Sequence, residues 1–254
     1  GANYGTDGQV LTSAGAGAAA AWEDSGGVAG KVEGTNFTGS LLVGHSTTGT
    51  LSAAQYNTGV GITALNSITS GDTNTAVGYD AGTAITSGLY NTAVGYGALI
   101  TASTTSSNVA VGRNSLKLTT GTGNTGIGRD SGENVAAGNN NTCIGFHAGD
   151  NITSGSGNVC IGMQADPSSA TGNNQLVIAT YDGSSTTSWV TGDSSGNLTF
   201  AADVTLGDDL LLDSDSCVLK FGDDQDVTLT HTDGTGLTLN STSKLCFYDT
   251  ALSI

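Results

Sequence analysis

One pattern of polar, small and β-branched residues recurs about every 17 positions between residue 40 and about residue 180. Each copy has an asparagine, a variable residue, a small residue, a valine or isoleucine, and a glycine. Successive asparagines stand 17, 17, 17, 16, 17 and 17 positions apart, at Asn57, Asn74, Asn91, Asn108, Asn124, Asn141 and Asn158. Variant copies at Ser40 and Asn174 bring the total to nine. Nine copies in one register indicate a repeat architecture.

The repeat positions are numbered here from the asparagine, which is position 0. Position 2 is small, as in Gly59, Ala76, Ala93, Ala110, Gly126, Cys143 and Cys160. Position 3 is β-branched in every copy, at Val43, Val60, Val77, Val94, Val111, Ile127, Ile144, Ile161 and Val177. A second aliphatic residue follows in most copies, as at Ile68, Ile85, Val135 and Ile152, and a turn glycine comes after it. β-Branched residues favour strands and glycine favours tight bends, so each copy predicts strand, bend, strand and turn.

A unit of this length is too short for a helical repeat and suits one coil of a parallel β-solenoid. The sequence therefore predicts an all-β solenoid over residues 40–180, without α-helix. Coils hydrogen-bond at roughly 4.8 Å spacing, so nine of them extend roughly 43 Å. We expect the repeated asparagines to form a corner ladder in which the side-chain amides bond along the stack.

The repeat columns also predict which residues are buried. We expect the aliphatic residues of position 3 to form one core ladder, with a thin second ladder from the later aliphatics. We expect the small residues of position 2 to provide a smooth surface for a neighbouring chain. Two aliphatic residues per coil make a small core, and such scaffolds usually need further support. These features predict that the chain oligomerises.

The segment beginning at Asn74, with Asn-Thr-Ala-Val-Gly-Tyr-x-Ala-Gly and a later Thr-Ser-Gly, resembles the head repeat of trimeric autotransporter adhesins of the YadA type. It resembles still more closely the related repeats of bacteriophage tail fibres. The resemblance covers residues 40–180. It implies a left-handed parallel β-roll, three chains per shaft and a role in attachment. The coil in this chain is longer than the usual adhesin unit.

The flanks predict two further segments. Residues 1–39 do not fit the repeat and indicate an N-terminal linker or connector, with an Ala/Gly run from residue 14 to residue 21. Residues 181–254 indicate a β-rich acidic C-terminal shaft segment. Its alternating runs predict strands at 197–200, 209–212, 218–221, 227–230 and 237–240. We expect the protein to continue beyond Ile254.

Composition and charge narrow the classes of function. The chain has 254 residues, 40 of them Gly, and 11% charged residues, against about 25% in a typical soluble domain. The net charge of −16, with 6 Lys+Arg, argues against nucleic-acid binding, because phosphates would be repelled. It also argues against attraction to anionic membranes. We expect no membrane insertion, because no apolar run is long enough to span a bilayer.

The cysteines argue against a zinc site, since none of Cys143, Cys160, Cys217 and Cys246 forms a Cys-x-x-Cys pair. Cys143 and Cys160 occupy position 2 of adjacent copies. We expect them to be stacked, buried and reduced, because disulfide torsions are demanding.

Other motifs give weak signals. Gly121 to Gly126 match Gly-x-Gly-x-x-Gly, but these glycines belong to the repeat and no helical pattern follows. His45 and His147 are expected on the solvated surface. His231 of three chains is a candidate axial metal ligand. Nine aspartates lie between Asp203 and Asp233 and are either solvated turn residues or a calcium site; the candidates for the calcium site are Asp213, Asp215, Asp223, Asp224 and Asp226.

We therefore assign no catalytic, cofactor-binding or metal-binding residue, and expect no cofactor and no enzymatic activity. The expected function is the structural shaft of a phage tail fibre or virion appendage, in the virion and extracellular. The alternatives are a segment of a bacterial surface adhesin and a non-catalytic part of a polysaccharide-degrading tailspike. The expected partners are two further copies of the chain, other tail or fibre proteins, and a host receptor reached through a tip outside this chain.

Overall fold

The computed structural model describes residues 36–202 and 204 in full, together with the backbone of six outlying strands. The outlying strands are β1 (Gln9–Thr12), β2 (Ala21–Asp24), β3 (Gly30–Val32), β15 (Val218–Phe221), β16 (Val227–Thr232) and β17 (Gly236–Leu239). The chain divides into two compact units, Gly1–Asp203 and Val204–Ile254. Every regular element among the described residues is a β-strand.

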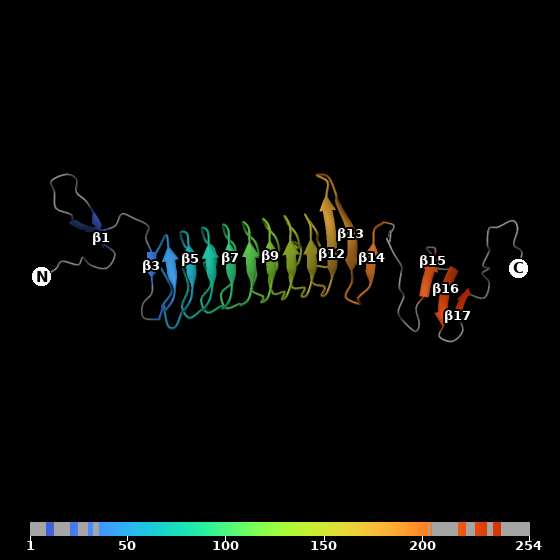
Figure 1. Cartoon of the computed structure of the whole chain (residues 1–254), viewed down its shortest axis with the longest axis horizontal. Coiled ribbons are helices and arrows are strands. Elements are labelled where there is room, and N and C mark those ends of the chain that lie inside the picture. The colour runs from blue at the N-terminus through green and yellow to red at the C-terminus, as the bar shows by residue number, and fades with distance from the viewer. Residues whose placement is uncertain are drawn as a thin grey trace, which may run out of the picture. The chain divides into compact units, whose positions relative to one another are not determined.

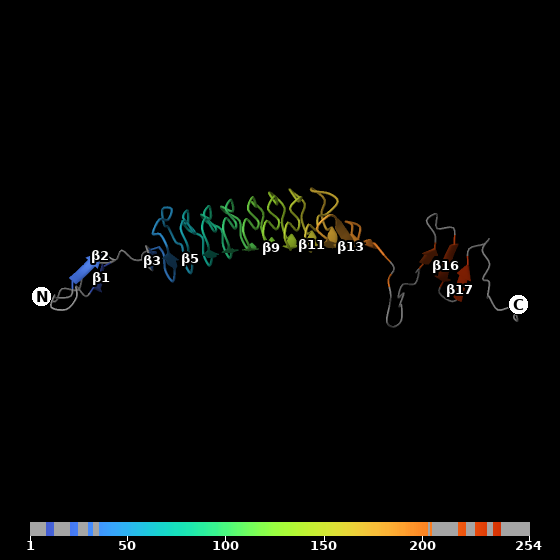
Figure 2. The same cartoon turned by 90° about the horizontal axis from the view of Figure 1, so that it is seen from above.

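The repeats form a β-solenoid whose coils are about 17 residues apart, as the repeat spacing predicts; it has about eight turns rather than the nine coils expected. Nine parallel strands stack in register, each three residues long except the last. They are β4 (Leu41–Val43), β5 (Thr58–Val60), β6 (Thr75–Val77), β7 (Thr92–Val94), β8 (Val109–Val111), β9 (Thr125–Ile127), β10 (Thr142–Ile144), β11 (Val159–Ile161) and β12 (Leu176–Tyr181). Figure 1 shows these strands side by side, and Figure 2 shows the sheet on one side of the coils with the turns on the other.

Antiparallel strands extend the parallel sheet at both ends. β3 pairs with β4, whereas β13 (Thr186–Gly192) and β14 (Leu198–Phe200) follow β12 through two hairpins. Two smaller sheets contain β1–β2 and β15–β16–β17. The predicted strands at 197–200, 218–221, 227–230 and 237–240 are confirmed within a residue or two, and 209–212 lies outside the described residues.

The repeated asparagines form a buried hydrogen-bonded ladder, which confirms the predicted bonding along the stack. The Nδ2 of Asn91 donates to Oδ1 of Asn74 at 3.0 Å and to the carbonyl of Thr105 at 2.8 Å. Its Oδ1 accepts from the backbone N–H of Asn108 at 3.1 Å and from Nδ2 of Asn108 at 3.2 Å. The amide is therefore fully satisfied without solvent, which removes the penalty of burying it.

The shorter step between Asn108 and Asn124 weakens the ladder at one place. The backbone N–H of Asn124 still donates to Oδ1 of Asn108 at 2.9 Å, but the Nδ2 of Asn124 donates to Thr119 Oγ1 and to the Gly138 carbonyl. The missing residue therefore costs one link between amide side chains and leaves the strand register intact.

The last copy has a different register from the one that the sequence predicts. Gln175, and not Asn174, takes the asparagine position, since its backbone N–H donates to Oδ1 of Asn158 at 2.9 Å. Val177 accordingly pairs with Cys160 at position 2, and Ile178 pairs with Ile161 at position 3. A glutamine reaches the same partners because its longer amide folds back onto Ser169 and Gly172.

The expected assignment of inner and outer columns is wrong. Position 2 faces the core, where Ala76 and Cys143 have no exposed surface. Position 3 faces outward, and Val77 is 38% exposed. Side chains alternate across a strand, so a buried asparagine at position 0 turns position 2 inward and positions 1 and 3 outward. The later aliphatics, including Ile68 and Ile85, are buried and form the second core ladder as predicted.

Left-handed backbone makes the corners of each coil. The glycines of position 4 have φ between 108° and 136° in Gly44, Gly61, Gly78, Gly95, Gly112, Gly128, Gly145 and Gly162. A Cβ on Gly95 would lie 2.5 Å from the carbonyl oxygen of Gly112, so the coils can approach only without a side chain there. Position 8 is also left-handed from Leu65 to Gly149, and it is occupied by either Gly or a buried Leu such as Leu65 (φ 56°).

The residue at position 8, either Gly or Leu, complements the size of the position 2 side chain that it contacts in the inner column. Gly149 lies under Cys143, where a Cβ would be 2.4 Å from the Cys143 sulfur. Gly126 instead leaves room for Leu116, whose Cγ would lie 2.9 Å from a Cβ. Small and large residues therefore alternate between positions 2 and 8 and keep the core filled.

Replacing Asn91 by Ala is expected to lower the stability of the solenoid by about 2 kcal/mol or more, because it leaves the buried N–H of Asn108 and the carbonyl of Thr105 without their side-chain partners. Asn66→Ala is the matched control, because the Asn66 side chain lies in the turn and only its backbone N–H is bonded within the described chain, to Thr63. Urea unfolding followed by circular dichroism would measure both; equal loss in the two variants would contradict a ladder that fixes the coils.

The thiols of Cys143 and Cys160 are expected to resist alkylation in the folded protein. The two residues pair across β10 and β11 and both are buried, which confirms the stacked and buried positions. A hydrogen bond with Cys143, together with burial, raises the pKa of the Cys160 thiol, so the reactive thiolate is disfavoured. Mass spectrometry after iodoacetamide treatment would show label only after unfolding. A 143–160 disulfide in freshly purified protein would contradict the expected reduced state.

Candidate functional site

The outer face of the solenoid's sheet is a uniform surface formed by positions 1 and 3 of β4–β12. Position 1 is Thr, Val or Leu in every strand and position 3 is Val or Ile, so the face carries no charge. Exposure at position 3 is 38% for Val60, 42% for Ile127 and 37% for Ile178. Pairing of Ile178 with Val190, and of Val190 with Phe200, continues the row over β13 and β14.

This outer sheet face differs from an ordinary protein surface in its length. Nine strands at about 4.8 Å spacing make a row of β-branched side chains roughly 38 Å long, before β13 and β14 are added. Exposed apolar patches of this kind mark interaction sites more often than free surface. The arrangement can bury apolar area against a partner, and the Thr, Val, Leu and Ile side chains at positions 1 and 3 include no ionisable group.

A second column, position 5, lies beyond the bend glycine and is rich in aromatic and cationic side chains. Tyr79 and Tyr96 stack with ring centroids 5.4 Å apart and an interplanar angle of 10°. Two coils further along, the Arg129 guanidinium lies 3.8 Å from the ring centroid of Phe146. These contacts join side chains of neighbouring coils at the surface, as cross-strand pairs do in ordinary sheets.

Charged residues of three successive coils meet at Asp130. Its carboxylate is 3% exposed; Oδ2 accepts from Arg113 Nη2 at 2.9 Å and Oδ1 accepts from Asn114 Nδ2 at 3.0 Å. Arg129 lies at 3.4 Å and His147 Nε2 at 3.7 Å from the same Oδ2. The buried charge is paired by two guanidinium groups, which offsets its desolvation.

The network continues through His147 to two further carboxyl groups. His147 Nδ1 lies 2.6 Å from Oδ2 of Asp150. Asp166, one coil later, is partly buried beside Asp150. Burial and the Asp150 charge raise the pKa of Asp166 to about 6.

The structure corrects the expectation for the two histidines of the solenoid. His45 is partly buried, and its Nε2 lies 2.7 Å from the carbonyl of Ala64, whereas its Nδ1 is buried without a partner among the described residues. His147 is partly buried within the Asp130 network. Neither is a freely solvated side chain, because His45 lies against the carbonyl of Ala64 and His147 lies against Asp130 and Asp150.

The remaining candidates give no site in the described part of the chain. Gly121, Gly123 and Gly126 fall in the turn and inner column of one coil, with no helix after them among the described residues. The described residues contain no group of three or more His, Cys, Asp or Glu side chains placed to hold a metal ion. His231 lies in β16, whose side chains are outside the described set, and so are the candidate aspartates from Asp213 to Asp226.

No protein-family model, curated protein or solved structure matches this chain. The described residues include no helix long and apolar enough to cross a membrane. The class that the fold defines is a β-solenoid repeat protein. Sequence reasoning missed the outer sheet face and the Asp130 network. The sequence signal for the outer sheet face is the unbroken series of uncharged residues at positions 1 and 3. The Asp130 network has no such signal, because it depends on which coils are in contact.

Asp166→Asn is expected to stabilise the protein at neutral pH and to have little effect near pH 4. The folded pKa of about 6 is above the ordinary value of 3.8, so between these values the folded state binds more protons than the unfolded state. Stability from this group is therefore present at low pH and lost as pH rises through about 6. Thermal melts of wild type and variant between about pH 4 and pH 7 would measure the difference.

Asp182→Asn is the matched control for this prediction. Backbone hydrogen bonds from Ser185 and Ser184 lower the pKa of Asp182, so its pH effect has the opposite sign. A melting difference between wild type and Asp166→Asn that does not grow with pH would contradict the raised pKa.

Proposed function

We propose that this chain is a shaft segment of a homotrimeric fibre that holds a receptor-binding tip away from a phage particle. The observation that carries the proposal is the outer sheet face, an uncharged apolar row on a long and regular solenoid. A rigid rod with one such face is suited to side-by-side association of parallel copies. The role is mechanical and extracellular, without catalysis.

The number of chains comes from the resemblance to tail-fibre and adhesin repeats, and the contact surface comes from the fold. The interface expected at position 2 is excluded, because that column is buried within each chain. Positions 1 and 3 take its place in the proposal. Identical ladders repeat at the same spacing in every copy, so a row of valines on one chain matches a row on the next without adjustment.

Assembly through this face also agrees with the charge of the chain, because positions 1 and 3 carry no charged side chain.

A bacterial surface adhesin is the first alternative to the proposed function. Such an adhesin would use the same shaft, so the fold favours neither the phage fibre nor the adhesin. A non-catalytic part of a polysaccharide-degrading tailspike is the second alternative to the proposed function.

The full chain is expected to behave as a trimer at micromolar concentration, with three times the 25.0 kDa mass of one chain. The double variant Val77→Lys/Ile144→Lys is expected to be monomeric and folded, because both side chains are exposed in one chain and lysine would place charge in the interface. Sedimentation velocity measures the mass, and circular dichroism checks the fold.

The matched control is Ser87→Lys/Thr104→Lys, which adds the same charge at exposed turn positions outside the sheet. This variant is expected to remain trimeric. A monomeric wild type would refute the trimer, and a trimer that survives lysine at both sheet positions would place the interface elsewhere.

A further inference from the structure

A second surface feature lies where the stack of coils ends. The sheet continues past the last coil by two strands, β13 and β14, which return through hairpins and have no coil beneath them. Their inner sides therefore overhang the loop that precedes β12. A cavity of about 270 Å³ lies in this hollow, lined by residues of the loop and of β12, β13 and β14.

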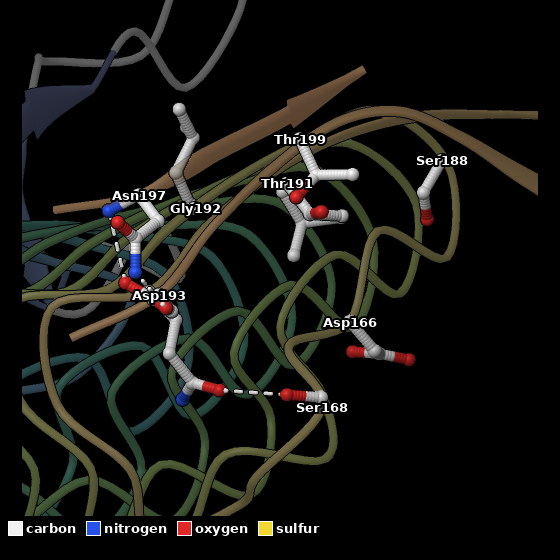
Figure 3. Close-up of a pocket in the computed structure, with 11 residues that line it drawn as sticks. Asp166, Ser168, Ser188, Thr191, Gly192, Asp193, Asn197 and Thr199 are labelled. Carbon is white, nitrogen blue, oxygen red and sulfur yellow. Dashed lines mark hydrogen bonds between the residues drawn. The ribbon is translucent and has the colours of Figure 1, made fainter. Parts of the chain in front are cut away.

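In β13 and β14, which overhang the last coil, the row that continues the buried inner column is open to solvent and changes from apolar to polar residues. The register runs from Cys160 through Val177 to Thr191 and Thr199. Position 2 is apolar and buried in the coils, whereas at the overhang two threonine hydroxyls occupy the same row. Figure 3 shows Thr191 and Thr199 together on one side of the cavity, with Asp166 and Ser168 on the other.

The lining groups are rich in hydrogen-bonding capacity that the protein itself does not use. The hydroxyls of Ser188, Thr191 and Thr199 have no partner among the described residues. Asp193 accepts from Asn197 Nδ2 at 2.8 Å and from the backbone N–H groups of Ser195 and Asn197, and these bonds keep its pKa below the ordinary value. The Asn197 side-chain oxygen is not engaged by these bonds. Several donors and acceptors therefore converge on one small cavity.

Charge limits what the cavity can bind. Its charged lining residues among those described are Asp166 and Asp193, and the sequence has no Lys or Arg between Arg129 and Lys220. Phosphates, sulfates and acidic sugars would meet carboxylates without a compensating cation. Leu176 and Val177 add apolar surface to the lining, but an apolar ligand would leave the serine and threonine hydroxyls unpaired.

We propose that this cavity, the β12–β14 cavity, binds one non-acidic sugar unit. A neutral or amino sugar offers hydroxyl groups that both donate and accept, which matches the free threonine and serine hydroxyls and the carboxylate and amide oxygens. The Asp193 carboxylate and the Asn197 amide accept from sugar hydroxyls, and Thr191 and Thr199 bind the sugar through their hydroxyls. The inference does not rest on the fibre role, because one chain forms the whole cavity.

Saturation-transfer NMR on the full chain tests the proposal with single sugars as probes. Galactose, N-acetylglucosamine and glucosamine are expected to receive saturation, and glucuronic acid and N-acetylneuraminic acid are not. Spermidine is included as a cation without a sugar ring. Saturation of none of the non-acidic sugars, equal saturation of the acidic sugars, or saturation of spermidine alone would each overturn the proposal.

Variants locate the binding in the cavity. Thr191→Val removes one hydroxyl at nearly constant volume and is expected to weaken sugar binding about fivefold, the effect of one lost hydrogen bond. Thr187→Val makes the same change on the same strand outside the cavity lining, and is expected to bind as wild type. Asp193→Asn and Asp182→Asn form a second matched pair in the two hairpin turns; the first is expected to weaken binding and the second to leave it unchanged.

The fold is checked in the same samples. Thr191 makes no side-chain hydrogen bond within the described protein, so Thr191→Val is expected to keep the melting temperature of wild type. Unchanged affinity in a folded Thr191→Val protein would overturn the site, whatever the oligomeric state. If Val77→Lys/Ile144→Lys is monomeric and still binds sugar, the sugar site does not depend on the trimer. The two proposals can therefore fail independently.

Discussion

The interaction on which the solenoid depends is the hydrogen bond between the side chain of one asparagine and the next coil. Oδ1 of each asparagine accepts from the backbone N–H of the asparagine that follows, as between Asn57 and Asn74 at 2.9 Å. The same oxygen accepts from the side-chain amide of Asn74 at 3.0 Å. This bond fixes the start of every strand over the one before it. Strands of three residues have too few ladder bonds of their own to prevent slippage, so the buried amide sets the register.

This constraint explains which sequence changes the repeat tolerates. Coil length varies by one residue between Asn108 and Asn124, because the change falls in the turn and the backbone link to Oδ1 persists. Gln175 replaces asparagine at the last coil, where the chain leaves the solenoid and the amide can fold back. The bend glycines vary less, since each approaches the carbonyl of the next bend more closely than a Cβ allows. Few residue types are therefore tolerated at positions where coils contact each other, whereas positions that face solvent accept many.

The sequence allowed prediction of the solenoid, the coil length and the asparagine bonding, because all three follow from spacing. It did not lead to the correct inner column, although the information was present. A buried asparagine at position 0 implies an inward position 2 by strand alternation, but the β-branched residue at position 3 predicts the core instead of a partner surface. Leu65 in left-handed backbone, the Asp130 network and the β12–β14 cavity depend on contacts between coils or on where the stack ends. Residue spacing alone carries no information on these.

The distribution of charge agrees with assembly through the outer sheet face. Residues 41–178 contain six acidic and three basic residues, a net charge of −3 out of −16 for the whole chain. The remaining −13 lies in the flanks, mostly after residue 181. In the proposed trimer, three parallel solenoids would bring together about −9, rather than the −48 that the whole chains carry, and the Asp130 carboxylate within each is paired with arginine. Electrostatic repulsion between neighbouring shafts is correspondingly weak, and the apolar rows at position 3 add no charge to it. The acidic flanks would in turn disfavour lateral association beyond the proposed trimer, so the sequence that permits this assembly would oppose larger aggregates.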